Sequence, residues 1–191
     1  MKKEIIFESK YGKGNIYLIQ QQEEKIGFKF PQSYINLILE YNGCKIKNNF
    51  DSFDFNSNSI GRIDSYYLEH FFSFNKNADS WLRFDWHWEN TLEFDEDEPF
   101  PKNIVPFASD PGREKICFDY RHDPKTDNPK IVVWHAEEER GSRSELSFVA
   151  TRFDEFLDML YDDRTEKEKI QYQENSWKNR ENRRKEALEN Q

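Results

Sequence analysis

The chain has 191 residues, a length that fits one domain with an appendage better than two full domains. Hydrophobic residues are 36% of the total and aromatic residues 16%, so a core can be built, with rings rather than Leu and Val as its main material. This excludes disorder for the body of the chain, despite a mean hydropathy of -1.04. The net charge of -9 speaks against direct binding of nucleic acid or an anionic membrane. It would attract a basic protein, and the alternative, which charge alone favours, is that it only keeps the protein soluble.

Two helices are predicted in the first quarter of the chain. Ile16, Ile19 and Ile26 can share one helical face, and Gly27 stands where that helix would end. A second helix is predicted after Pro31, which suits a first turn, and before the left-handed stop at residues 42–43. Its apolar face follows the i, i+3, i+4, i+7 pattern, with Tyr34, Leu37, Ile38 and Tyr41.

The middle of the chain alternates polar and aromatic segments. Residues 47–60 are rich in Asn, Ser and Asp and predict a loop or a weak edge strand. Residues 66–74 are aromatic and predict a strand. Trp81, Phe84 and Trp88 recur at spacings of three and four, which predicts a short helix over residues 78–91.

The last third of the body predicts strands followed by a helix. Residues 104–108, 116–120, 131–134 and 145–150 are apolar or β-branched, and the second and third of these segments look like antiparallel neighbours joined by a polar turn. A helical stripe then comprises Phe153, Phe156, Leu157, Leu160 and Tyr161. We therefore expect one α+β domain over residues 1–161, with a mainly antiparallel sheet packed with helices.

The composition changes after Tyr161. Residues 162–191 hold eight acidic and eight basic residues, so the whole charge of -9 belongs to residues 1–161. Few large apolar groups occur there, and Trp177 is the most prominent. We expect a charged C-terminal extension that forms a solvated helix or is partly disordered.

Neither a targeting segment nor a disulfide is expected. Residues 1–14 have no apolar signal core, and the apolar runs elsewhere are too short to span a membrane. The two cysteines, Cys44 and Cys117, are far apart in the sequence and both stand in apolar surroundings. These features favour a cytoplasmic protein with two reduced core thiols.

The sequence offers little for catalysis. Neither a phosphate-binding glycine loop nor a GxSxG elbow occurs, and no His pair has metal-ligand spacing. Asp85 and His87 could join His122 and Asp123 in a metal site, but common side chains at undiagnostic spacing make this a weak alternative. We expect no catalytic residue, no metal and no cofactor.

The charge pattern is more informative. Seven carboxylates without an intervening Lys or Arg occupy residues 85–98, and residues 137–139 form a second acidic run. Four large rings accompany the first run: Trp81, Trp86, Trp88 and Phe94. Carboxylates beside large rings suit a protein-binding surface, because the charges steer a basic partner and the rings supply buried contact. The alternative is a solvated loop beside a core helix. The predicted partner-binding residues are Asp85, Trp88, Glu89, Glu93, Asp95, Glu96, Asp97, Glu98, Glu137 and Glu138.

Several short motifs together resemble the SUKH superfamily, the Smi/Knr-type domain shared by bacterial immunity proteins and fungal cell-wall regulators. Each motif is weak alone, but their joint order over residues 16–161 is specific. The motifs are IGFKFPQSY at residues 26–34, EYNG at 40–43, IVPFA at 104–108, ICFDYR at 116–121, NPKIVVW at 128–134 and FDEFL at 153–157. Two departures from the family pattern are Arg113, where an acid is common, and Thr151 with Arg152 before the last helix.

The resemblance implies an immunity protein that binds and neutralises a secreted or contact-delivered toxin, such as a nuclease, as a monomer or homodimer. The residues that match are structural by their chemistry, which agrees with a binding scaffold. A regulatory scaffold that binds endogenous partners is the alternative, and a metal-dependent hydrolase is a third class.

Overall fold

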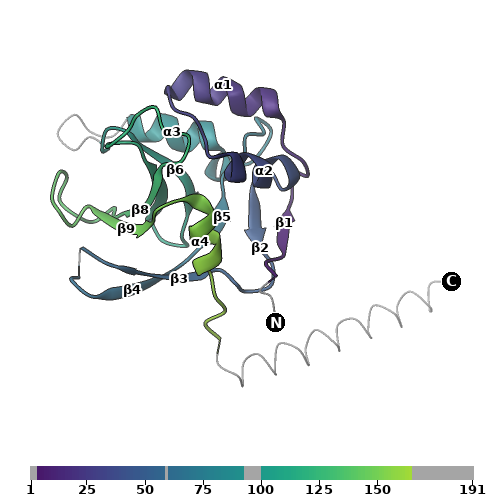
Figure 1. The fold of residues 1–191 in the computed structure, drawn as a ribbon. Helices are drawn as coiled ribbons and strands as arrows, with labels where there is room; N and C mark the ends of the chain where they lie inside the picture. The colour runs from purple at the N-terminus through teal and green to yellow at the C-terminus, as the bar shows by residue number, and fades with distance from the viewer. Residues whose placement is uncertain (1–3, 59, 93–99, 165–191) are drawn as a thin grey trace, which may run out of the picture. The chain divides into compact units, whose positions relative to one another are not determined.

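The computed structural model describes residues 4–58, 60–92 and 100–164 (Figure 1). The chain divides into two compact units, Met1–Tyr161 and Asp162–Gln191. The predicted C-terminal extension lies outside the described residues after Arg164. In chain order the elements are β1 (Phe7–Ser9), α1 (Ile16–Ile26), α2 (Gln32–Glu40), β2 (Cys44–Ile46), β3 (Ser52–Asn56), β4 (Ile63–Tyr67), β5 (His70–Phe71), the 3-10 helix η1 (Ser80–Leu82), α3 (Phe84–Leu92), β6 (Ile104–Ser109), β7 (Lys115–Asp119), β8 (Lys130–Trp134), β9 (Leu146–Ala150) and α4 (Phe153–Met159).

Antiparallel strands and helices form the first unit, so the α+β prediction is confirmed. The main sheet has the order β5-β6-β7-β8-β9, and two further two-stranded sheets pair β1 with β2 and β3 with β4 (Figure 1). The predicted neighbours are paired in register, with Cys117 opposite Val132 and Phe118 opposite Ile131. Helix α4 contacts α2, β8 and β9, while β3 runs beside β9.

Aromatic rings fill the core, as the composition predicts. The ring of Tyr34 on α2 is fully buried and makes edge contacts with Phe107 at 5.6 Å, Phe118 at 5.2 Å and Phe153 at 5.3 Å. Phe107 and Phe118 stack at 4.2 Å across β6 and β7. Edge-to-face and stacked pairs of this kind add stability beyond the area that they bury. The core therefore joins α2 and α4 to the centre of the sheet.

The first two helices begin and end close to the predicted points. Asn15 caps α1, because its side-chain oxygen accepts a hydrogen bond from the Tyr17 amide at 2.9 Å. Gly27 ends α1 with a φ of 80°, a left-handed conformation that suits glycine. Helix α2 starts one residue after Pro31 and ends at Glu40, before the left-handed Gly43 with a φ of 63°.

Of the loop or weak edge strand predicted at residues 47–60, the structure shows the strand alternative, and the next two predicted elements need correction. The stretch at residues 47–60 holds a full strand, β3, in which buried Phe53 and Phe55 alternate with exposed Asp54 and pair with β4. The predicted strand over residues 66–74 contributes only the two-residue β5 to the main sheet, because Ser73 leaves it to pair with Arg83. The predicted short helix at residues 78–91 is divided into η1 and α3.

Deletion of residues 162–191 is expected to leave a cooperatively folding domain. Tyr161, the last residue retained, exchanges two backbone hydrogen bonds with Ser52 at 2.8 and 3.1 Å and donates its hydroxyl to Asp54 at 2.6 Å. These contacts fix the end of the body against β3, so the melting temperature should shift by less than about 4 °C. Thermal unfolding followed by circular dichroism measures this. A truncated chain without a cooperative transition would refute the prediction.

Candidate partner-binding site

Three tryptophans surround the turn from η1 into α3. Trp81 is 53% exposed and Trp86 is 38% exposed, whereas Trp88 is partly buried and packs against the core. Phe84 and His87 are buried on the same helix, so α3 turns one face to the core and leaves Trp86 outside. Of the three rings, Trp81 and Trp86 are therefore better placed than the predicted Trp88 to contact a partner.

Buried imidazoles hold the backbone beneath Trp81. The Trp81 carbonyl accepts a hydrogen bond from Nε2 of His87 at 2.7 Å, and Nε2 of His70 lies 3.3 Å from the same oxygen. Burial lowers the pKa of His87 to about 3 and that of His70 to about 4, so both rings are neutral at physiological pH. His87 also stacks on Phe72 at 3.7 Å. These contacts give His87 a packing role and fix the position from which Trp81 projects.

A hollow of about 330 Å³ lies beside Trp81. Its rim includes Asp79, which accepts hydrogen bonds from the Tyr11 hydroxyl at 2.9 Å and from the Lys10 ammonium at 3.1 Å. The edge of the Trp81 ring contacts the His70 ring at 5.1 Å. The exposed ring therefore stands next to a depression with polar groups on its rim, an arrangement that suits contact with another protein.

Two of the predicted carboxylates are matched by cations that lie outside the acidic run. Asp85 accepts hydrogen bonds from Nε and Nη2 of Arg83 at 2.8 and 2.6 Å, and this pairing lowers the pKa of the Asp85 carboxyl. Glu89 forms an ion pair of 2.5 Å with Lys25 of α1. Both contacts reduce the repulsion within the run. Asp85 and Glu89 would therefore contribute less than the other carboxylates of residues 85–98 to the attraction of a basic partner.

The remaining predicted residues fall into two groups. Glu93, Asp95, Glu96, Asp97 and Glu98 lie outside the described residues. Glu137 is exposed and forms an ion pair of 3.1 Å with Arg113, while Glu138 is partly exposed and its carbonyl accepts a hydrogen bond from Arg140. The second acidic run thus belongs to the β8–β9 connection and uses different cations from those of α3.

The turn that departs from the family pattern is tied to this connection. Asp110 accepts hydrogen bonds from the amides of Gly112 at 2.9 Å and Glu114 at 3.1 Å. Glu114 in turn accepts one from the Ala136 amide at 2.9 Å, and burial raises the pKa of its carboxyl to about 7. Arg113 therefore projects from a turn whose two carboxylates are occupied by backbone amides.

Replacement of Glu114 by Gln is expected to flatten the dependence of stability on pH. The folded-state pKa of about 7 lies above the ordinary value of 4.5, so the folded chain binds the proton more tightly than the unfolded chain. The stabilisation is complete below about pH 4.5 and is lost as the pH rises through 7. The wild type should therefore lose roughly 1–3 kcal/mol more than the variant between pH 5 and 8.

Urea unfolding of both proteins at pH 5, 6, 7 and 8 measures this difference. Nδ1 of His135 lies 3.7 Å from the Glu114 carboxylate, so loss of the carboxyl also shifts the titration of His135, and the difference between the two pH profiles belongs to the pair. Parallel pH profiles for the wild type and Glu114→Gln would show that the Glu114 carboxyl is charged in the folded protein throughout this range.

Both thiols are core groups, as the sequence predicts. Cys44 and Cys117 are fully buried, and burial raises the pKa of both, that of Cys44 to about 12. Within the part of the chain that the structure describes, no group of three or more His, Cys, Asp or Glu side chains is placed to hold a metal ion. The helices of this part include none that is long and apolar enough to cross a membrane.

The chain is similar to known proteins over most of its length. The family model described as SMI1 / KNR4 family (SUKH-1) matches residues 14–159, which span α1 to α4. A curated relative, the SPbeta prophage-derived uncharacterized protein YokK of Bacillus subtilis (strain 168), is 26% identical over 162 residues. That alignment covers 79% of this chain and 77% of the relative. With this match over most of its length, the chain belongs to the SMI1/KNR4 family (SUKH-1).

Proposed function

We propose that this chain is an immunity protein that binds a cognate toxin in the cytoplasm and neutralises it by covering its working surface. The observation that carries the proposal is the pair of exposed rings, Trp81 and Trp86, beside a run of carboxylates. Membership of the SUKH-1 family and the net charge of -9 support it. Toxins that act on nucleic acid need cationic surfaces, which an acidic protein can cover.

The aromatic rings and the carboxylates would act on different steps of toxin binding. Trp81 and Trp86 would enter pockets on the toxin and exclude water, which slows dissociation. The carboxylates of residues 93–98, with Glu137 and Glu138, would attract the basic toxin from a distance and speed association. Asp85 and Glu89 would add less, because Arg83 and Lys25 already balance them.

A triple neutralisation tests the charges. Replacing Glu93, Asp95 and Asp97 by Gln, Asn and Asn should slow association with the toxin roughly 3- to 30-fold at low salt and much less at 0.5 M salt. The partner is first identified by pull-down with the full chain, beginning with the products of neighbouring genes, and its binding is then measured by surface plasmon resonance.

The matched control changes the same number of charges elsewhere on the body. Glu40, Asp127 and Asp154 are exposed carboxylates on other elements, and their replacement by Gln, Asn and Asn should alter the association rate less. If both triple variants slowed association equally, the acidic run would act only through the net charge of the protein and not through its position. An unchanged association rate for the first triple would reject the run as the interface.

A further inference from the structure

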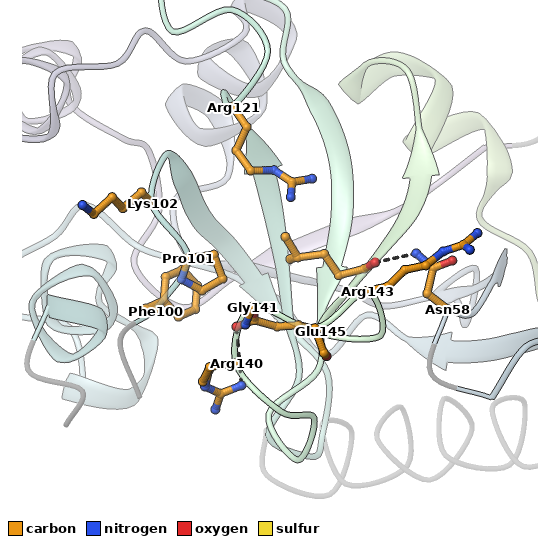
Figure 2. Close-up of a pocket in the computed structure, with 11 residues that line it drawn as sticks. Asn58, Phe100, Pro101, Lys102, Arg121, Arg140, Gly141, Arg143 and Glu145 are labelled. Carbon is orange, nitrogen blue, oxygen red and sulfur yellow. Dashed lines mark hydrogen bonds and ion pairs between the residues drawn. The ribbon is translucent and has the colours of Figure 1, made fainter. Parts of the chain in front are cut away.

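A cationic hollow interrupts the acidic surface of the body. It has a volume of about 660 Å³ and lies between the segment that leads into β6 and the β8–β9 connection. Four basic side chains line it, as Figure 2 shows: Lys102, Arg121, Arg140 and Arg143. We call this hollow the cationic pocket. Its concentration of positive charge is unexpected in a chain whose net charge is -9.

Two of the guanidinium groups are fixed by protein contacts. Arg121 donates from Nε and Nη2 to the buried Asp119 carboxylate at 2.9 and 2.8 Å, which leaves its other N–H groups available. Arg140 lies over the Trp134 ring at 4.6 Å and donates to the carbonyls of His135 and Ala136 at 3.3 and 3.0 Å. Such contacts hold both groups in place before a ligand arrives, which lowers the entropy cost of binding.

Carboxylates balance only half of this charge. Glu145 is buried at the side of the pocket, and its carboxylate lies 3.6 Å from Nη1 of Arg140. Its two oxygens also accept hydrogen bonds from Trp134 Nε1 at 3.1 Å and from the Gly141 amide at 2.8 Å. Asp119 matches Arg121. Lys102 and Arg143 are exposed, and neither takes part in an ion pair among the described residues. Two positive charges of the pocket therefore remain without a protein counter-charge in the described chain.

An apolar wall completes the pocket. Phe100 and Pro101 line one side (Figure 2). The Phe100 ring is 9% exposed and packs on Trp134 at 4.8 Å. On the other side Asn58 donates a hydrogen bond to the Leu146 carbonyl at 2.7 Å, which holds the β3–β4 connection against β9. The pocket thus combines oxyanion-binding groups with a surface for an uncharged organic moiety.

We propose that the cationic pocket binds a small phosphate-bearing organic molecule of nucleotide size. Its volume falls in the range of about 300–1,000 Å³ that is common for small-molecule sites. The terminal phosphate of such a molecule carries about -1.5 to -2 at pH 7, which matches the two unbalanced charges. Arginine N–H groups pair well with phosphate oxygens, and the wall at Phe100 would receive the organic part. Arg140 and Arg143 of the pocket lie in the same β8–β9 connection as Glu137 and Glu138 of the proposed toxin surface, but the ligand can be tested without the toxin.

Calorimetric titration of the full chain with ADP tests the proposal, with inorganic phosphate and adenosine as the two partial probes. We expect saturable ADP binding in the micromolar range, at least 10-fold weaker binding of inorganic phosphate, and no measurable binding of adenosine. The double variant Lys102→Gln/Arg143→Gln should weaken ADP binding at least 10-fold. The control variant Lys76→Gln/Arg152→Gln removes the same charge from exposed positions outside the pocket, and it should change the affinity for ADP less than 2-fold.

Three results would overturn the proposal. One is the absence of saturable ADP binding at millimolar concentration. Another is an equal loss of affinity in the two double variants, which would assign binding to net charge. The third is equal affinity for inorganic phosphate and ADP, which would show that the wall at Phe100 receives no organic group. Circular dichroism and thermal unfolding of each variant establish that all of them are folded.

Discussion

Truncation of Phe156 to Ala is expected to lower the free energy of unfolding by roughly 3–5 kcal/mol. The Phe156 ring is fully buried and contacts Phe53 of β3 at 5.2 Å and Phe107 of β6 at 6.0 Å. Its removal would leave a cavity where α4, the β3–β4 hairpin and the main sheet meet. Because a domain of this kind is stable by only about 5–15 kcal/mol, the variant should unfold at a much lower urea concentration.

Phe148 on β9 provides the matched control. Its ring is 48% exposed, so Phe148→Ala should cost less than about 1 kcal/mol. Both variants are compared with the wild type by urea unfolding at pH 7. If Phe156→Ala cost no more than Phe148→Ala, α4 would not be the element that closes the core.

Loss of the two exposed rings is expected to have the largest effect on partner binding. The double variant Trp81→Ala/Trp86→Ala should raise the dissociation rate of the toxin complex about 10- to 100-fold, because large rings at interfaces often carry 2 kcal/mol or more. The association rate should change little, since neither ring is charged. The melting temperature should fall only modestly, because both rings are substantially exposed.

Tyr17 on α1 is the control for this experiment. Its side chain is 72% exposed, so Tyr17→Ala removes an outward ring from a different surface and should leave both rate constants unchanged. Trp88→Ala should act differently again, by lowering stability, because this ring packs on the core. A double tryptophan variant with the wild-type dissociation rate would place the interface elsewhere.

The periodic parts of the fold could be predicted from the sequence. Tyr34 and Ile38 repeat at helical spacing between a proline and a glycine, and the structure places both on the face of α2 that is buried in the protein core. Phe156 on α4 was found in the same way, because burial of one helical face imposes a period that the residues themselves display. Leu37 and Leu157 share these helices but are only partly buried.

The β3–β4 hairpin could not be predicted with the same success. Phe53 and Phe55 alternate correctly for a strand, but Asn, Ser and Asp around them are typical of a loop. The strand is stabilised by distant partners, through register with Tyr66 and through the Phe53 contact with Phe156. Contacts of such long sequence separation leave no local signal.

The candidate site shows the same limit. The sequence identified α3 and its acidic run, but it did not indicate that Lys25, 64 residues away, would pair with Glu89. Nor did it separate Trp81 and Trp86, which face outward, from Trp88, which packs on the core. The spacing of three from Trp81 to Phe84 suggested a continuous helix, whereas the 3-10 turn η1 rotates Trp81 away from it.

Titration of the toxin's activity with the purified full chain tests the central claim most directly. The substrate is chosen from the chemistry of the partner that the pull-down identifies. If the chain neutralises the toxin by covering its working surface, activity should fall linearly and reach zero at one equivalent of the chain. Formation of a stable complex in which the toxin keeps its full activity would contradict the account.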